Sequence, residues 1–271
     1  MGRVEEARCA DGTKIGYRIH GASNAGARIA LVHSLAMDHR FWDPVAERLS
    51  DEAAVLTFDC RGHGASDKSP GPYTVELFAH DLADLFDHVG WSSAVVAGAS
   101  MGGCVSLAFA DVYPARVQAL GLFDTTAWYG PDAQQQWAER ADRALEAGLQ
   151  NLVEFQTTRW FGDRFREENP EIVEDSVRIF LANDVNAYSE TCRMLGACDL
   201  RAALPHIRVP TRILVGEEDY ATPVKMAETL HAGIKGSTLT VLPGARHLTP
   251  LEVPDRITAE IETLLREGTQ A

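Results

Sequence analysis

Residues 95–105, "VVAGASMGGCV", place Ser100 between two glycines at the point where one apolar run ends and another begins. The run before the serine is β-branched, which favours a buried strand, and the run after Met101 suits a helix. A serine at the tip of a strand-to-helix turn needs a strained backbone, and the flanking chains come so close that only glycine fits at 98 and 102. The stretch therefore predicts a nucleophile elbow, the Gly-x-Ser-x-Gly turn that lifts a serine hydroxyl clear of a sheet.

Short apolar runs of the same kind recur along the chain, at 28–33, 53–58, 94–97, 117–123, 211–215 and 238–242. Each is rich in Val, Ile and Leu and ends in a small or polar residue, as central strands of a parallel sheet do. Residues 76–89 have the spacing of an amphipathic helix, and two alternating runs around Asp11-Gly12 predict a hairpin. This alternation predicts an α/β fold, with a mostly parallel eight-stranded sheet flanked by helices.

Residues 126–200 break this rhythm, because their aromatic side chains lie in helix-like segments without a convincing strand. We therefore predict a helical cap at 126–200, inserted after about the sixth strand of a core made of residues 1–125 and 201–271. Within the cap, we expect Trp128 and Trp160 to form walls of a substrate pocket and Trp137 to belong to the cap's own interior.

The composition limits the classes of function. The 271 residues carry a net charge of −14 without a basic block, which disfavours nucleic acid and anionic membranes as partners. The five cysteines are scattered and lack the spacing of a zinc site, so we expect reduced thiols and no metal. No apolar run approaches the length of a membrane span and the first residues are charged, so we expect a cytoplasmic protein. Self-association into a homo-oligomer stays open.

A serine alone is a weak nucleophile near neutral pH, so an elbow requires a base and an acid further along the chain. His247, in "LPGARHLTPLEVP", follows the last apolar run and can reach back over the strand ends, and Asp219, in "LVGEEDYATP", follows the run before it. We predict a triad in which Asp219 orients His247 and His247 takes the proton of Ser100. The rivals for the acid are Asp124, which is the strongest of them, Glu217 and Glu218.

The segment "FDCRGHGASD" at 58–67, together with the elbow and the histidine loop, resembles the α/β-hydrolase superfamily, and the resemblance covers nearly the whole chain. Within it, the chain is most similar to 3-oxoadipate enol-lactonases. The matching stretches are "HSLAMDHRFWDPV", "FDCRGHGASDKSPGPYTVELFAHDL", "GASMGG", "DTTAWYGP" and "CDLRAALPHIRVPT". The resemblance implies a cofactor-free serine hydrolase that opens a small lactone or ester, with 3-oxoadipate enol-lactone as one candidate. It also implies an oxyanion hole made of the N–H groups of Leu35 and Met101.

The chain departs from this family at three places. It has His33-Ser34-Leu35-Ala36 where Asn-Ser-Leu-Gly is usual, and Phe123-Asp124-Thr125 where Ala-Asn-Thr is usual. We expect His33 to structure its loop. Gly196 stands where an arginine is expected, so Arg159 or Arg193 is the candidate for binding a substrate carboxylate.

Three alternative functions share the fold. The serine at position 100 excludes the dehalogenases and epoxide hydrolases that need an aspartate nucleophile. A carbon–carbon bond hydrolase and a cofactor-free haloperoxidase use the same three residues and stay open. A small-molecule receptor, which would bind its ligand with little turnover, is the alternative from a different class.

Overall fold

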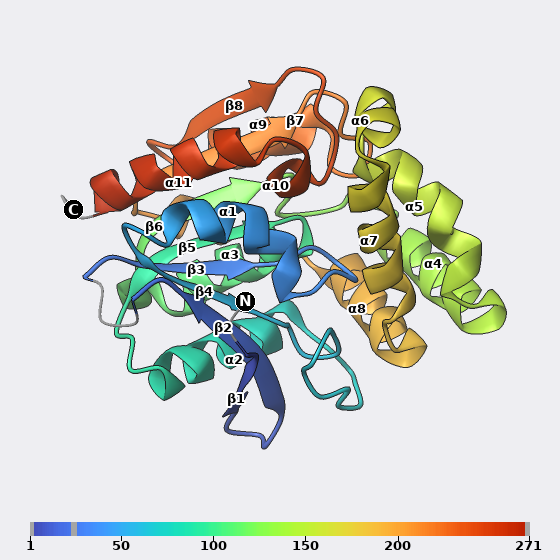
Figure 1. Cartoon of the computed structure of the whole chain (residues 1–271), viewed down its shortest axis with the longest axis horizontal. Coiled ribbons are helices and arrows are strands. Elements are labelled where there is room, and N and C mark those ends of the chain that lie inside the picture. The colour runs from blue at the N-terminus through green and yellow to red at the C-terminus, as the bar shows by residue number, and fades with distance from the viewer. Residues whose placement is uncertain (1–2, 23–25, 269–271) are drawn as a thin grey trace.

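The computed structural model describes residues 3–22 and 26–268, and its centre is an eight-stranded sheet (Figure 1). The strand order is β1-β2-β4-β3-β5-β6-β7-β8. The strands are β1 (Glu5–Arg8), β2 (Lys14–His20), β3 (Arg28–Val32), β4 (Ala54–Phe58), β5 (Ala94–Ala99), β6 (Val117–Phe123), β7 (Thr211–Gly216) and β8 (Thr238–Leu242). β2 runs antiparallel to both of its neighbours, and all other pairs are parallel. The predicted hairpin and mostly parallel sheet are confirmed.

The sheet is covered by helices on both faces, which explains why β4 and β5 are buried at every position. These helices are α1 (Asp43–Leu49), α2 (Val75–His88), α3 (Met101–Val112), α9 (Val224–Gly233), α10 (Thr249–Glu252) and α11 (Pro254–Gly268). α1 packs against α11 on one face, and α2 packs against α3 on the other (Figure 1). The helix expected at 76–89 is α2, and the Thr74 hydroxyl caps it by accepting a hydrogen bond of 3.1 Å from the Leu77 N–H.

Five α-helices lie between β6 and β7 and gather on one side of the sheet (Figure 1). They are α4 (Ala133–Ala147), α5 (Val153–Trp160), α6 (Asp163–Glu168), α7 (Pro170–Leu181) and α8 (Val185–Ala197). A single antiparallel bridge between Trp128 and Asp199 joins the two ends of this segment. We call residues 126–200 the cap, and its division from the core at these boundaries stays a prediction.

Four short 3₁₀ helices complete the secondary structure of the described residues: η1 (His39–Trp42), η2 (Pro114–Arg116), η3 (Leu149–Leu152) and η4 (Leu204–His206). None of the helices in the described part of the chain combines the length and the apolar character that crossing a membrane requires.

The register of the central strands sets the position of the elbow. Gly98 in β5 pairs with Val32 in β3, and Ala99 pairs with Phe123 in β6. Ser100 and Asp124 therefore leave the sheet side by side at its carboxyl edge, where ligand sites of open α/β sheets lie.

Candidate active site

Ser100 connects β5 to α3 in the strained conformation that the elbow requires, with φ 56° and ψ −118°. A Cβ atom on Gly98 would lie 2.1 Å from the Gly102 carbonyl oxygen, and one on Gly102 would lie 2.1 Å from the Val32 carbonyl oxygen. Neither position can accept a larger residue without moving the backbone. The prediction that only glycine fits at these two positions is confirmed.

The catalytic candidates form one hydrogen-bonded chain. His247, in the loop between β8 and α10, has Nε2 3.0 Å from Ser100 Oγ and Nδ1 2.8 Å from Asp219 Oδ2. Asp219 follows β7, and its carboxylate also accepts hydrogen bonds from Ala221 N (2.7 Å), Thr222 N (2.9 Å) and Thr222 Oγ1 (2.8 Å). A carboxylate on Nδ1 keeps the proton there, which leaves Nε2 free to accept the serine proton.

The rival acids have other partners. Asp124 is fully buried, and its carboxylate accepts hydrogen bonds from Gly216 N (3.0 Å) and Thr249 Oγ1 (2.5 Å) instead of His247. Burial and the nearby charge of Asp219 raise the pKa of Asp124 well above its usual range. Glu217 accepts from Gly244 N at 3.1 Å, and Glu218 pairs with Arg246 at 2.8 Å.

The backbone N–H groups of Leu35 and Met101, near Ser100, have no hydrogen-bond partner among the described residues. Met101 is the first residue of α3, so its N–H lies at the positive end of the helix dipole. Leu35 follows β3 and lines the same cavity as Ser100. Both groups suit an oxyanion hole.

His33 holds the loop that carries Leu35. Its Nε2 accepts a hydrogen bond from Cys60 N (2.9 Å), and its Nδ1 therefore donates to the Ser34 carbonyl (2.8 Å). Burial lowers the pKa of His33, which favours the neutral ring that this pattern needs. The ring thus braces the loop against the segment after β4, as we expected.

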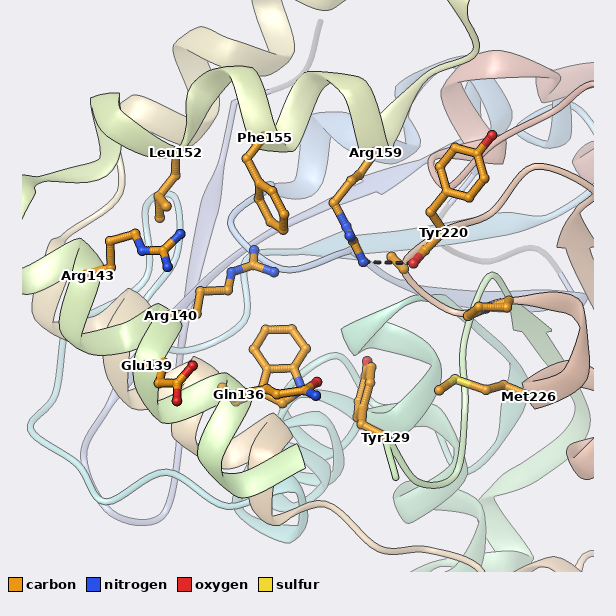
Figure 2. Close-up of a pocket in the computed structure, with 13 residues that line it drawn as sticks. Tyr129, Gln136, Glu139, Arg140, Arg143, Leu152, Phe155, Arg159, Tyr220 and Met226 are labelled. Carbon is orange, nitrogen blue, oxygen red and sulfur yellow. Dashed lines mark hydrogen bonds between the residues drawn. The ribbon is translucent and has the colours of Figure 1, made fainter. Parts of the chain in front are cut away.

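The serine lies in a cavity of about 60 Å³ that adjoins a larger one of about 470 Å³. Tyr129, Trp137, Arg140, Arg159 and Ala221 line both, so these five residues lie where the outer and the inner cavity adjoin. Figure 2 shows the larger cavity, with Arg140 from α4 and Arg159 from α5 directed into it. Gln156 and Trp160 line the inner cavity with Ser100 and His247.

Arg140 and Arg159 form no ion pair with any described carboxylate. Arg140 Nε donates to the Tyr188 hydroxyl (2.7 Å), and Arg159 Nη2 donates to the Tyr220 carbonyl (2.7 Å; Figure 2). Burial, together with the positive charge of Arg140, lowers the pKa of Arg159. Two neighbouring cations without an acidic partner make the inner cavity, which both arginines line, suited to an anion.

The structure separates the four residues expected at the substrate pocket. Arg159 and Trp160 line the inner cavity. Trp128 lies instead at the base of the cap, with the Arg201 guanidinium carbon 3.8 Å from its ring centre. Arg193 lies on the outer side of α8, where it pairs with Asp142 (2.9 Å) and Glu190 (3.2 Å).

Trp128 and Arg193 line neither cavity, so they make structural contacts instead of the expected contacts with a substrate. Trp137, which we expected inside the cap, lines both cavities. Arg140, which also lines both cavities, was not predicted from the sequence. A signal for it exists, because no acidic residue lies three or four positions away from it along the helix.

One cluster could be considered for a metal ion, since donor atoms of Asp38, His39 and Asp59 lie within 4.8 Å of one another. The two carboxylates and His39 Nδ1 already have partners. The Arg40 guanidinium pairs with Asp38 (2.6 Å), and His39 Nδ1 and N both bond to Asp59 Oδ1. Arg40 supplies the positive charge that a cation would bring, so we assign the cluster to the folding of this loop.

Known proteins resemble the chain over nearly its whole length. The family model described as alpha/beta hydrolase fold matches residues 28–254. A 3-oxoadipate enol-lactonase of Acinetobacter baylyi is 30% identical over 93% of each chain. An enol-lactonase structure from Burkholderia xenovorans has 31% identity and a TM-score of 0.93, covering 97% of this chain and 100% of that one. A thermophilic esterase structure from Thermogutta terrifontis has 30% identity and a TM-score of 0.91, covering 98% and 99%.

Proposed function

The chain belongs to the α/β hydrolase family, and from this premise we propose that it hydrolyses a small carboxylic ester or lactone through Ser100, His247 and Asp219 without a cofactor. The observation that carries the proposal is the hydrogen-bonded chain from Asp219 through His247 to Ser100, beside two free N–H groups. Similarity to an enol-lactonase and to an esterase supports the same reaction class.

In the first half-reaction, Ser100 Oγ attacks the acyl carbon while His247 Nε2 takes its proton. The carbonyl oxygen becomes an oxyanion that accepts hydrogen bonds from the N–H groups of Leu35 and Met101. When the tetrahedral intermediate collapses, His247 gives the proton to the leaving oxygen. In a lactone this oxygen stays attached to the acyl chain, so ring opening leaves one acyl-enzyme and no free alcohol.

In the second half-reaction, His247 takes a proton from water, and the resulting hydroxide attacks the acyl carbon. The second tetrahedral intermediate uses the same oxyanion hole. Its collapse breaks the bond to Ser100 Oγ, which recovers the proton from His247. Asp219 stays ionised throughout and stabilises the imidazolium formed in each step.

We also propose that the substrate carries a carboxylate that Arg140 and Arg159 bind. Guanidinium groups without an acidic partner, stacked on aromatic rings, suit this anion, and Arg140 lies 4.8 Å from the centre of the Trp137 ring. The enol-lactone of 3-oxoadipate has a free carboxylate. At Gly196, a Cβ atom would lie 3.0 Å from the Trp137 Cβ, so α4 occupies the space of the arginine expected there. α4 itself supplies an arginine to the cavity, Arg140.

The test compares kcat/KM for 3-oxoadipate enol-lactone and for phenyl acetate in the wild type, Ser100→Ala and Arg140→Gln. We expect Ser100→Ala to lose several orders of magnitude with both. Arg140→Gln should lose roughly 10- to 100-fold with the lactone alone, because hydrogen bonds to charged groups contribute about 1.5–3 kcal/mol.

Arg193→Gln is the matched control and should leave both rates unchanged. Activity retained by folded Ser100→Ala would overturn the triad. The wild type could instead prefer phenyl acetate, with Arg140→Gln losing equal activity toward both substrates. That result would overturn the proposal that the substrate carries a carboxylate, and it would leave the catalytic triad unaffected.

A further inference from the structure

Gln156 is a buried amide in the catalytic cavity that no role described so far uses. It lies on α5, three and four residues before Arg159 and Trp160, so all three share one helix face. That face lines the cavity of about 60 Å³ together with Ser100 and His247. Gln156 is 3% exposed.

The amide of Gln156 makes no hydrogen bond to any described residue. Buried amides in proteins nearly always have a partner, because an unpaired donor or acceptor costs free energy. Neither polar atom of the Gln156 side chain is completely buried without a partner, so both atoms still face open space. The inner cavity is the space that this residue lines.

We propose that Gln156 is a specificity-determining residue that binds an uncharged oxygen atom on the acyl part of the substrate, close to the scissile carbonyl. The inference rests on the proposed function, because Ser100 and the oxyanion hole fix the acyl carbon in this same cavity. The charged guanidinium groups of Arg140 and Arg159 suit an anionic group of the substrate, whereas a neutral amide suits an uncharged oxo, hydroxyl or ether oxygen. A purely hydrocarbon acyl group would leave the amide unpaired, so the site discriminates against it.

The test uses two esters of nearly equal shape, phenyl methoxyacetate and phenyl butanoate, which differ by an ether oxygen in place of a methylene group. The ratio of their kcat/KM values is measured in the wild type, Gln156→Leu and Gln156→Met. Intrinsic reactivity is common to all three proteins and cancels between them. We expect both variants to lower the ratio at least about tenfold, with the loss arising mainly from the oxygenated ester.

Thermal unfolding separates this role from a structural one. Gln156→Leu and Gln156→Met should keep or raise Tm, because they replace an unpaired buried amide with apolar groups. Gln135→Leu, an exposed glutamine on α4, is the matched control and should leave the ratio unchanged.

An unchanged ratio in either folded variant would overturn the role of Gln156, as would a lowered Tm with equal rate losses for both esters. Failure of the proposed function has a different signature. Ser100→Ala would then hydrolyse both esters at the wild-type rate, whatever the ratio in the Gln156 variants.

Discussion

Asp124 and Asp219 are buried carboxylates that follow the neighbouring strands β6 and β7, and their partners separate their roles. Asp219 accepts from the His247 ring and from two backbone N–H groups of its own turn. Asp124, held at φ 46°, joins the ends of β6 and β7 to the start of α10. Asp219 thus orients the catalytic base, whereas Asp124 links the ends of β6 and β7 to the segment that follows β8 at the carboxyl edge of the sheet.

This division predicts opposite effects for two matched substitutions. Asp219→Asn should lower kcat by roughly 10⁴-fold with little change in stability, because an amide does not hold the Nδ1-protonated form of His247. Asp124→Asn should keep most of the activity and lose about 1–3 kcal/mol of unfolding free energy, because its NH₂ group would face a donor. Steady-state kinetics and urea unfolding measure the two effects. A reversed ranking in kcat would make Asp124 the acid.

At this scale, the sequence was informative where a residue follows a strand and misleading where it lies on a helix. Ser100, Asp219 and His247 all follow apolar runs, and parallel strands end at one edge. A helical position does not tell which face meets a cavity. Arg193 has Glu190 one turn before it, a surface pattern that favours an exposed ion pair, whereas Arg140 has no such partner. The absence of an acidic residue one helical turn away therefore makes Arg140 a better candidate than Arg193 for binding a substrate anion.

At the scale of elements, the cap contacts the catalytic loops directly. The carbonyl of Trp160, the last residue of α5, accepts hydrogen bonds from His247 N (3.1 Å) and Leu248 N (3.0 Å). On the other side, Asn183, just after α7, donates from Nδ2 to the carbonyl of Ala36 (2.8 Å). Ala36 adopts φ 58°, the left-handed region, next to the proposed oxyanion donor Leu35. The position of the cap is thus coupled to both catalytic loops.

Asn183→Ala should lower kcat about 3- to 30-fold and leave KM nearly unchanged, because a loosened Ala36 carbonyl weakens a donor that acts mainly in the transition state. Asn183→Asp should show the same loss, since a carboxylate has no proton to donate to the Ala36 carbonyl. Kinetics with phenyl acetate measure the effect. The exposed neighbour Asn186→Ala is the control. A rise in KM at constant kcat would contradict the assignment and place Asn183 in substrate binding.

The elements themselves were largely predictable, because buried parallel strands and amphipathic helices carry strong periodic signals. β3, β4, β5, β6, β7 and β8 each overlap a predicted apolar run, and α2 begins and ends within one residue of its prediction. The packing of the cap helices was not predictable, because it depends on contacts between residues far apart in sequence. The close approach of α4 to α8 at Gly196, which places Trp137 and Arg140 at the cavity, is such a contact.

On the scale of the whole molecule, the loops after β3 and β4 meet through two buried histidines. The rings of His33 and His63 pack edge to face with centres 5.0 Å apart. Burial lowers the pKa of both, and that of His63 falls from 6.5 to about 3, with the nearby His33 as a further cause. Both histidines are therefore neutral in the folded protein down to acidic pH, whereas they take up protons in the unfolded chain below about pH 6.5.

The unfolded state then binds more protons between about pH 6.5 and about pH 3, so the free energy of unfolding falls as the pH is lowered through this window. His63 alone contributes a slope that approaches about 1.4 kcal/mol per pH unit. We expect His63→Gln to reduce the slope by nearly this amount between about pH 6 and about pH 5, whatever its effect on absolute stability. Urea unfolding at a series of pH values measures the slope, and carboxylate titration cancels between the two proteins. Equal slopes in the wild type and His63→Gln would mean that His63 is protonated in the folded protein, in conflict with its burial against His33.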